Sequence, residues 1–287
     1  MDQAFNWNIK IEGVRDFNLK EIFDCGQCFR WEHLPEDESI WQGLAGAYPA
    51  AMKYDESLQT LHIADMAGAG EAFWRNYLDL DRDYGAIKKL LEDGDEAMAE
   101  AIKCGSGIRI LKQEPWEALV SFIISQNNNI PRIKKCINSL AAEIGEPIND
   151  GLYALPSAQD LAKATIEDLA PCRLGYRAKY LIEAGRQISE DEGFLARLQE
   201  TSVDGAKAAE ELQKICGVGP KVANCIALFG LNKLDCFPLD VWMKRVMNQV
   251  YGIPENDVKA MRTYAEEHFG QYGGIAQQYL FNFIARA

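Results

Sequence analysis

The sequence predicts an α+β protein, in which a small N-terminal antiparallel β-sheet domain packs on a mainly α-helical domain. Over the first 65 residues, apolar and aromatic residues alternate in short runs, which is typical of half-buried strands. From about residue 70 the apolar residues recur at helical spacing instead. The chain has 287 residues, of which 48% are hydrophobic, so it can build the core of one large or two ordinary domains.

Four segments of the N-terminal part are expected to form strands. Each is rich in β-branched or aromatic residues, and an Asp-Glu-Ser turn signal precedes the last of them. The segments are residues 7–11, 28–31, 40–42 and 58–63. We place the sheet domain, with its flanking helices, at residues 1–107 and the helical domain at residues 108–287.

Proline and glycine residues divide the helical part, in which no strand is expected. Pro115 is expected in the first turn of a helix that runs to about Gln126, and Pro131 in the first turn of another. Glycines are predicted to end helices at Gly145, Gly193 and Gly230.

The charge of the chain is acidic, with a formal net value of −13, but it is unevenly distributed. Residues 1–107 hold 10 Lys and Arg against 21 Asp and Glu, whereas the rest of the chain holds 20 against 22. A nearly neutral region can still bind phosphates through a few ion pairs and backbone N–H groups. We therefore expect weaker salt dependence than for a basic DNA-binding domain.

Composition also indicates the compartment. No run of about 18 apolar residues occurs, and the first ten residues lack the features of a signal peptide, so no membrane is expected. Eight cysteines are scattered through the chain, which indicates free thiols. We expect a cytoplasmic protein, associated with the nucleoid in a prokaryote, or a nuclear protein in a eukaryote.

Residues 204–230 predict a helix-hairpin-helix. Asp204 is expected to cap a first helix, and the segment 216–220 then breaks it with two glycines, Gly217 and Gly219. Pro220 is placed to begin a second helix. The N–H groups of such a hairpin, at a helix N-terminus, can hold a DNA phosphate without a basic side chain.

Lys221 lies in the first turn of the second helix, with Cys225 one turn further on the same face. The helix dipole and the apolar neighbours are expected to lower the pKa of this lysine, as a nucleophilic amine requires. The alternative is a surface lysine whose aliphatic stem covers the hairpin.

Asp240 follows Pro238 and precedes an apolar helical run. The segment therefore predicts a helix N-cap at Asp240. A carboxylate in that position can also stabilise a cation that develops on a sugar, so the two roles are compatible.

The segment from Gly217 to Ala223, together with Asp240, resembles the signature of the helix-hairpin-helix (HhH-GPD) DNA glycosylase superfamily. The lysine inside the hairpin resembles its bifunctional glycosylase/lyase branch. Three further segments, in the same order, resemble the 8-oxoguanine DNA glycosylase/lyase family. They are CGQCFRW at residues 25–31, SFIISQNNNI at residues 121–130 and LGYRAKY at residues 174–180.

This resemblance implies how the lesion base is recognised. In 8-oxoguanine N7 carries a hydrogen, whereas N7 of guanine is an acceptor, so the Gly26 carbonyl would discriminate between them. Cys225 and Phe281 would sandwich the flipped base, and Gln277 would pair with its Watson–Crick edge. The alternatives are a turn between strands for Gly26, a core position for Phe281 and a solvated helix residue for Gln277.

The resemblance also implies contacts to the rest of the duplex. Asn127 is similar to the residue that fills the gap left by the flipped base. Arg132, Tyr176 and Arg177 match positions that hold or wedge beside the unpaired cytosine. The alternatives are a polar loop for residues 127–129 and core packing for Tyr176.

The implied reaction begins with attack of the neutral Lys221 amine on C1′ of the lesion nucleotide, while Asp240 stabilises positive charge on the sugar. Loss of the base gives a Schiff base, and β-elimination then nicks the strand. This chemistry requires no metal or organic cofactor. The expected partner is double-stranded DNA that contains 8-oxoguanine, opposite cytosine, and the enzyme is expected to act as a monomer.

The sequence departs from the family in two places. Trp242 stands where the family often has a histidine that meets a phosphate near the lesion, which puts that contact in doubt. The chain also ends soon after Phe281, which leaves a short final helix.

Other functions fit parts of the sequence. Cys25 and Cys28 could form a redox or zinc pair, although no second pair and no closely spaced histidines complete a zinc site. The four-cysteine cluster of the iron–sulfur glycosylases is absent from the C-terminal part. The remaining alternatives are a glycosylase for other damaged or alkylated purines and a non-catalytic DNA-binding protein.

Overall fold

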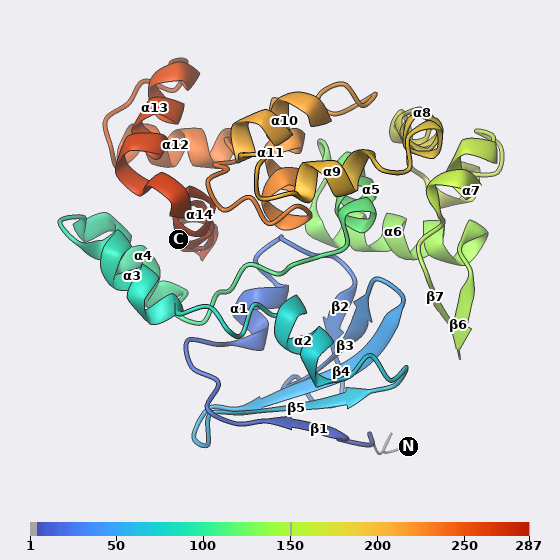
Figure 1. Cartoon of the computed structure of the whole chain (residues 1–287), viewed down its shortest axis with the longest axis horizontal. Coiled ribbons are helices and arrows are strands. Elements are labelled where there is room, and N and C mark those ends of the chain that lie inside the picture. The colour runs from blue at the N-terminus through green and yellow to red at the C-terminus, as the bar shows by residue number, and fades with distance from the viewer. Residues whose placement is uncertain (1–4, 150, 287) are drawn as a thin grey trace.

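The computed structural model describes residues 5–149 and 151–286, and it has the predicted α+β architecture. A five-stranded antiparallel sheet forms the lower part of the molecule in Figure 1, and the helices of the C-terminal part lie above it. Within the described residues, no helix is both long enough and apolar enough to cross a membrane.

The sheet has the strand order β1-β5-β4-β3-β2, and all its neighbouring strands are antiparallel. The strands are β1 (Ile9–Ile11), β2 (Trp31–His33), β3 (Ile40–Ala45), β4 (Tyr48–Asp55) and β5 (Thr60–Asp65). The sequence did not predict β4, because Pro49 and two alanines weaken its strand pattern. Pairing with a strand on each side nevertheless makes it the longest strand of the sheet.

Aromatic side chains build the core between this sheet and the two helices that cover it. The indole of Trp31 stacks on Phe23 with ring centroids 4.5 Å apart, and its Nε1 donates a hydrogen bond to the Tyr77 hydroxyl at 2.8 Å. Phe23 comes from helix α1 (Leu19–Phe23) and Tyr77 from helix α2 (Glu71–Tyr77). These contacts fix the chain just before β2, where the Cys25–Cys28 turn lies.

The predicted positions of prolines and glycines at the ends of the remaining helices are confirmed with one exception. Pro115 and Pro131 lie in first turns, and Gly145 and Gly230 follow helix ends as predicted, but Gly193 precedes a helix instead of ending one. The helices are α3 (Tyr84–Glu92), α4 (Glu96–Cys104), α5 (Pro115–Ser125), α6 (Ile130–Ile144), α7 (Ala158–Lys163), α8 (Arg177–Glu190), α9 (Phe194–Gln199), α10 (Gly205–Leu212), α11 (Pro220–Phe229), α12 (Val241–Gln249), α13 (Val258–Phe269) and α14 (Gly273–Arg286). Two short 3-10 helices, η1 (Ala170–Cys172) and η2 (Gly270–Tyr272), join them.

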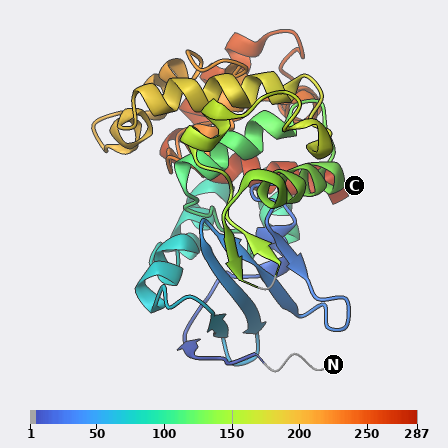
Figure 2. The same cartoon turned by 90° about the vertical axis from the view of Figure 1, so that its right-hand side faces the viewer.

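The expectation of no strand in the helical part is wrong. Strands β6 (Pro147–Asn149) and β7 (Leu152–Tyr153) form a small hairpin after α6. In Figure 2 this hairpin reaches down beside the sheet domain, where Arg30 donates a hydrogen bond to the Tyr153 carbonyl. The strands are too short to show an alternating pattern in the sequence.

Helices α3 and α4 precede residue 107, yet they pack into the hydrophobic core of the helical part. Ile87, Leu91 and Met98 are buried in that core, and α4 packs against α14 near the C-terminus. One hydrophobic core thus includes helices on both sides of residue 107. The domain boundary at this residue stays a proposal.

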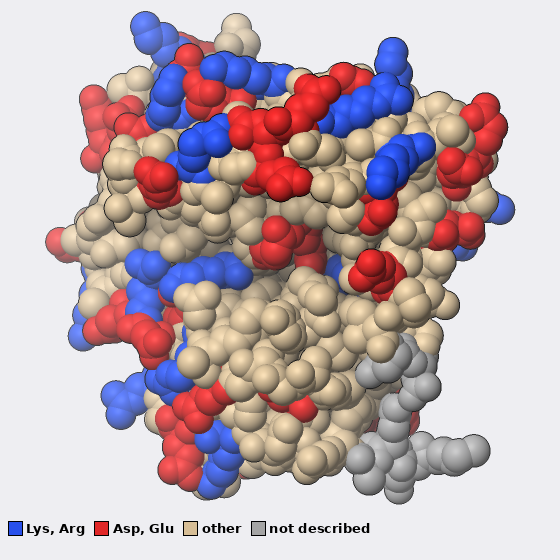
Figure 3. Space-filling model, turned by 45° about the vertical axis from the view of Figure 1, so that its right-hand side comes forward, with Lys and Arg blue, Asp and Glu red and all other residues tan. Residues whose placement is uncertain are grey.

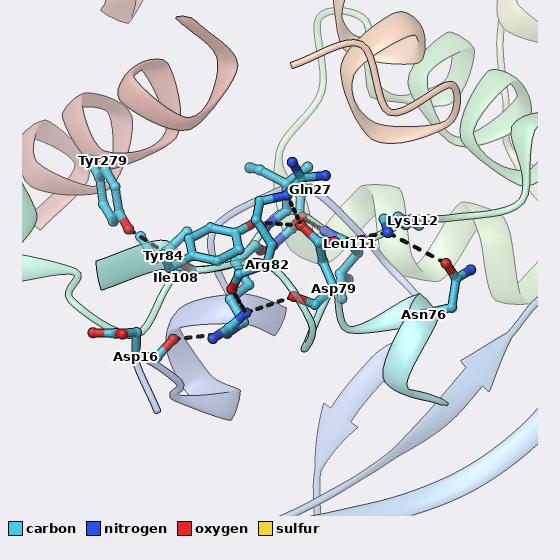
Figure 4. A network of polar contacts seen from close by, with 12 residues as sticks. Asp16, Gln27, Asn76, Asp79, Arg82, Tyr84, Ile108, Leu111, Lys112 and Tyr279 are labelled. Carbon is cyan, nitrogen blue, oxygen red and sulfur yellow. Dashed lines mark hydrogen bonds and ion pairs between the residues drawn. The ribbon is translucent and has the colours of Figure 1, made fainter. Parts of the chain in front are cut away.

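The segment that joins α4 to α5 passes between the two parts and is held by polar contacts (Figure 4). The carboxylate of Asp79, which is buried, accepts from Lys112 Nζ at 2.9 Å and from the Tyr84 hydroxyl at 3.1 Å. The same hydroxyl accepts a hydrogen bond from the Ile110 backbone N–H at 2.9 Å. These contacts fix the segment that leads into α5, one of the helices around the site described next.

Candidate active site

The predicted helix-hairpin-helix is present. Asp204 caps α10 by accepting from the Lys207 N–H at 2.7 Å, and α11 begins at Pro220 with Gly219 as its N-cap. Gly217 has a φ of +83°, and a Cβ at this position would lie 2.4 Å from Cγ of Tyr180. Both the backbone conformation and the close approach of Tyr180 therefore require glycine here.

One pocket collects the residues that the sequence assigned to chemistry and base recognition. It lies where α11, α14 and the start of α12 meet the turn before β2. Its lining residues are Cys25, Gly26, Phe122, Lys221, Cys225, Phe229, Pro238, Asp240, Gln277, Gln278 and Phe281. The cavity volume is about 50 Å³, far below the several hundred Å³ usual for ligand pockets, so side chains that line it must move to admit a purine.

Lys221 projects into this pocket, with its ammonium nitrogen 5.9 Å from the ring centroid of Phe122. The expectation that its pKa is lowered is wrong. The electrostatic interaction with Cys225, followed by that with Asp240, raises the pKa of Lys221, and burial does not offset them. The direction differs from the expectation because the electrostatic effects of Cys225, on the same helix, and of Asp240 outweigh burial.

The pKa of Cys225 is governed mainly by burial. Burial raises the pKa of the thiol, and the nearby Lys221 lowers it by less. The side chain hydrogen-bonds with Lys221, as expected for residues one helical turn apart.

Asp240 caps α12, as predicted. Its Oδ1 accepts a hydrogen bond from the Met243 N–H at 2.8 Å, and it also lines the pocket that contains Lys221. The N-cap hydrogen bond holds the carboxylate in one orientation at the N-terminus of α12. The carboxylate therefore caps the helix and also faces the pocket, as both of the predicted roles require.

Helix α14 supplies two further walls. Gln277 is 5% exposed, so the alternative of a solvated helix residue is wrong, and its Oε1 is buried without a hydrogen-bond partner. Phe281 is half-buried and lines the pocket. A buried amide oxygen without a partner costs about 1–3 kcal/mol, and a ligand N–H at this position would remove that cost.

Gly26 faces Phe281 across the pocket. Its φ is +79°, and a Cβ built on it would lie 3.8 Å from Cε1 of Phe281. Glycine is therefore favoured by the turn conformation, and the turn brings its backbone against the wall of the pocket.

The predicted DNA-contacting residues lie on the outside of the same region. Asn127 has a φ of +46°, and its Nδ2 donates to the Tyr176 hydroxyl at 3.3 Å. Tyr176 is 47% exposed, so the alternative of core packing is wrong. Arg132 is exposed in the first turn of α6.

Arg177 differs from the prediction of a residue that faces the unpaired cytosine. It is 4% exposed, and its guanidinium donates hydrogen bonds to the Gln126 carbonyl and, at 3.0 Å, to the Asn127 carbonyl. Its donors are therefore used inside the protein, where they hold the loop that carries Asn127. The sequence could not show this because the backbone acceptors lie about 50 residues away along the chain.

The sequence analysis did not assign five of the lining residues to this site, namely Cys25, Phe122, Phe229, Pro238 and Gln278. It also did not assign Gln126, whose Nε2 donates to the Gly217 carbonyl at 3.0 Å and ties the Asn127 loop to the hairpin. For the two glutamines, the available signal was an amide in or beside an apolar helical run, because a buried amide must find partners.

The redox and zinc alternatives for Cys25 and Cys28 do not fit the structure. Both thiols are buried, which raises the pKa of Cys25 to about 11 and that of Cys28 well above its usual value. Such thiols are poor nucleophiles at neutral pH. Among residues 5–149 and 151–286, no group of three or more His, Cys, Asp or Glu side chains could hold a metal ion.

Figure 3 shows acidic and basic side chains interspersed over one face of the molecule, without a single large basic patch on that face. The expected weak salt dependence of DNA binding stays a prediction. Beside the pocket, Trp242 is 52% exposed, and the guanidinium of Arg245 lies over its ring at 5.0 Å from the centroid.

A hairpin at a helix N-terminus, followed by a lysine and an aspartate in one pocket, defines a helix-hairpin-helix DNA glycosylase. Comparison with known families agrees with this class. Residues 3–119 match the family "8-oxoguanine DNA glycosylase, N-terminal domain", and residues 120–271 match "HhH-GPD superfamily base excision DNA repair protein". The chain belongs to the 8-oxoguanine DNA glycosylase/lyase family of the HhH-GPD superfamily, and it is a bifunctional DNA glycosylase and lyase.

Individual relatives support the same placement. An N-glycosylase/DNA lyase of Saccharomyces cerevisiae is 32% identical over 279 residues, which cover 85% of this chain and 72% of the relative. The 8-oxoguanine glycosylase/lyase of Clostridium acetobutylicum, solved with double-stranded DNA containing cytosine opposite 8-oxoguanine, is 38% identical. Its TM-score is 0.89, with 96% of this chain and 94% of that chain covered. A 3-methyladenine DNA glycosylase of Archaeoglobus fulgidus shares the fold, with a TM-score of 0.72 at 21% identity.

Proposed function

We propose that this enzyme removes 8-oxoguanine opposite cytosine from duplex DNA and then cleaves the abasic strand through a Schiff base on Lys221. One observation carries the proposal: a single pocket brings Lys221 and Asp240 together with Gly26, Gln277 and Phe281. Those residues come from four separate parts of the chain.

Base recognition in this proposal depends on complementary hydrogen bonds. The Gly26 carbonyl accepts the N7 hydrogen that 8-oxoguanine has and guanine lacks. Gln277 pairs with the Watson–Crick edge, and its unpartnered Oε1 is an acceptor already free for this purpose. Cys225 and Phe281 enclose the two faces of the base, after Phe281 has moved far enough to enlarge the pocket.

The raised pKa of Lys221 adds a step to the reaction, because the cation must lose its proton before it can attack. Entry of the nucleotide displaces water from the pocket, and this desolvation favours the neutral amine. The amine attacks C1′, and the base leaves with the electrons of the glycosidic bond and takes up the proton that the amine loses. The C1′–O4′ bond then breaks and O4′ takes up a proton, which opens the sugar ring and gives a Schiff base between C1′ and Lys221. Asp240 stabilises the positive charge on the sugar, and β-elimination then removes a C2′ proton and breaks the C3′–O bond.

The rest of the interface grips the DNA around the flipped nucleotide. The N–H groups of the hairpin at Gly217 and Gly219 hold a phosphate at the N-terminus of α11. Asn127 fills the gap, Tyr176 wedges beside it and Arg132 donates to the unpaired cytosine. Arg177 supports the Asn127 loop from inside, as its buried hydrogen bonds indicate.

The enzyme is proposed to act as a monomer, in the cytoplasm or, in a eukaryote, in the nucleus. The reaction written above uses only side chains of this chain, so no cofactor is proposed.

The substrate proposal is tested by a nicking assay on duplexes that carry each of the four bases opposite 8-oxoguanine, beside duplexes with alkylated purines. The fastest cleavage is expected with cytosine opposite 8-oxoguanine. Equal or faster excision of alkylated purines would instead favour a glycosylase for those bases.

A further inference from the structure

The turn that carries Gly26 is held by buried side-chain amides. Gln27 is fully buried, and its Nε2 donates to the carbonyls of Ile22 at 2.9 Å and Arg109 at 2.8 Å, while its Oε1 accepts from the Leu111 N–H at 2.9 Å. Figure 4 shows Gln27 beside Leu111 in this arrangement. The turn is therefore fixed to the segment between α4 and α5.

The carbonyls on both sides of Gly26 are occupied. Gln278 Nε2 donates to the Cys25 carbonyl at 2.6 Å, and Gln113 Nε2 donates to the Gln27 carbonyl at 2.7 Å. Within the described residues, no group donates a hydrogen bond to the Gly26 carbonyl. The amides therefore leave one acceptor of this turn free, at the residue that lines the pocket.

Gln278 connects this turn to the opposite wall. It is 2% exposed and follows Gln277 on α14, and its hydrogen bond to the Cys25 carbonyl joins α14 to residues 25–28. The helix that presents the Gln277 amide is thus fixed directly to the turn that presents the Gly26 carbonyl.

We propose that Gln278 is a positioning residue for lesion recognition, which sets the separation between the Gly26 carbonyl and the Gln277 amide to fit 8-oxoguanine. This inference rests on the proposed function of Gly26 and Gln277. The N7 hydrogen and the Watson–Crick edge lie at a fixed separation in the rigid base, so both bonds form only at one spacing of the two walls. Loss of the Gln278 bond lets the turn shift, and a shift of about 1 Å can cost about a hundredfold in rate.

The test compares two reactions of the same protein. Gln278→Met keeps the size of the side chain and removes its donors, and Gln278→Glu keeps its shape while replacing the donor by an oxygen. We expect excision of 8-oxoguanine opposite cytosine to fall by about a hundredfold in both variants. Cleavage of a preformed abasic site, which contains no base to recognise, should stay within about threefold of the unmodified enzyme. The preference for binding 8-oxoguanine over guanine should fall as well.

Asn282→Leu is the matched control, because Asn282 lies on the same helix, is similarly buried, and has a side-chain nitrogen without a partner. This variant should leave the ratio of 8-oxoguanine excision to abasic-site cleavage unchanged. The inference is overturned if both Gln278 variants excise 8-oxoguanine at the normal rate, or if both activities fall by the same factor. If the unmodified enzyme cleaves abasic DNA but does not excise 8-oxoguanine, the proposed function fails instead.

Discussion

Lys221 and Cys225 lie one turn apart on α11, and the thiol side chain raises the pKa of the lysine more than Asp240 does. Lys221, the proposed nucleophile, is therefore a cation in the DNA-free enzyme, hydrogen-bonded to the residue expected to cover one face of the base. The neutral amine forms only as the pH rises or as water leaves the pocket.

Replacing Cys225 should change the pH dependence of catalysis. Because Cys225 is the largest influence that raises the pKa of Lys221, Cys225→Ala should lower that pKa. The rising limb of the rate of abasic-site cleavage against pH should then move to lower pH. Cys136→Ala, a buried thiol of α6 outside the pocket, should leave the profile in place; an unmoved limb in Cys225→Ala would contradict the assigned cause.

Asp240 can be tested separately as a helix cap and as a charge. Asp240→Asn keeps an oxygen that can accept from the Met243 N–H, so its thermal stability should match that of the unmodified enzyme. Its excision rate should nevertheless fall by about 100- to 1,000-fold, because the charge that stabilises the sugar cation is gone. Asp240→Ala should in addition lose about 1 kcal/mol of stability. If Asp240→Asn excised the base at the normal rate, the charge would have no part in catalysis and Asp240 would act only as a helix cap.

Glu117 predicts a pH dependence of folding. Burial raises its pKa to about 7, while Arg30 nearby lowers it by less, and its Oε2 accepts from the Gly46 N–H at 3.0 Å. A raised carboxyl pKa favours the protonated form in the folded state, so its stabilisation is complete below the unfolded pKa of 4.5 and is lost up to about pH 7. The loss is at most about 3 kcal/mol.

Urea unfolding at pH 5 and pH 8 measures this effect. Glu117→Gln does not titrate, so it should lose less stability than the unmodified enzyme between the two pH values. Glu183→Gln, on the exposed face of α8, should behave like the unmodified enzyme. Parallel losses in the Glu117 variant and the unmodified enzyme would show that Glu117 does not carry the dependence.

Arg132 and Arg177 should respond differently to truncation. Arg132 is exposed, so Arg132→Ala should fold normally and lose about tenfold of its preference for cytosine opposite the lesion. Arg177→Ala leaves the Asn127 carbonyl without its donor and the Gln126 carbonyl with only the 3.4 Å bond from the Tyr176 hydroxyl, so it should lose roughly 1–3 kcal/mol of stability. It should also slow excision opposite all four bases. The nicking assay and thermal unfolding measure these outcomes. If Arg132→Ala lost stability and Arg177→Ala lost the preference for cytosine, the roles assigned to the two arginines would have to be exchanged.

Local chemistry explains what the sequence could predict. Gly217, Gly219 and Pro220 specify the hairpin within a few residues, and the Asp240 cap depends only on the N–H three residues later. The pairing of β4 could not be predicted in this way, because its weak pattern is compensated by two neighbouring strands.

The electrostatics and the buried amides depend on contacts between distant segments. Two of the influences on the pKa of Lys221, burial and Asp240, depend on segments outside α11, whereas Cys225 lies one turn away on the same helix. Gln278 lies 253 residues from its acceptor, Cys25. A glutamine pattern can indicate that an amide is buried, but only the fold identifies its partner.

The central claim, that Lys221 is the nucleophile, is tested most directly by borohydride trapping on a duplex with 8-oxoguanine opposite cytosine. The unmodified enzyme should form a covalent protein–DNA adduct, because borohydride reduces the Schiff base, and Lys221→Gln should form none. A covalent adduct with Lys221→Gln at the normal yield would contradict the assignment. Failure of the unmodified enzyme to form any adduct would contradict the lyase mechanism itself.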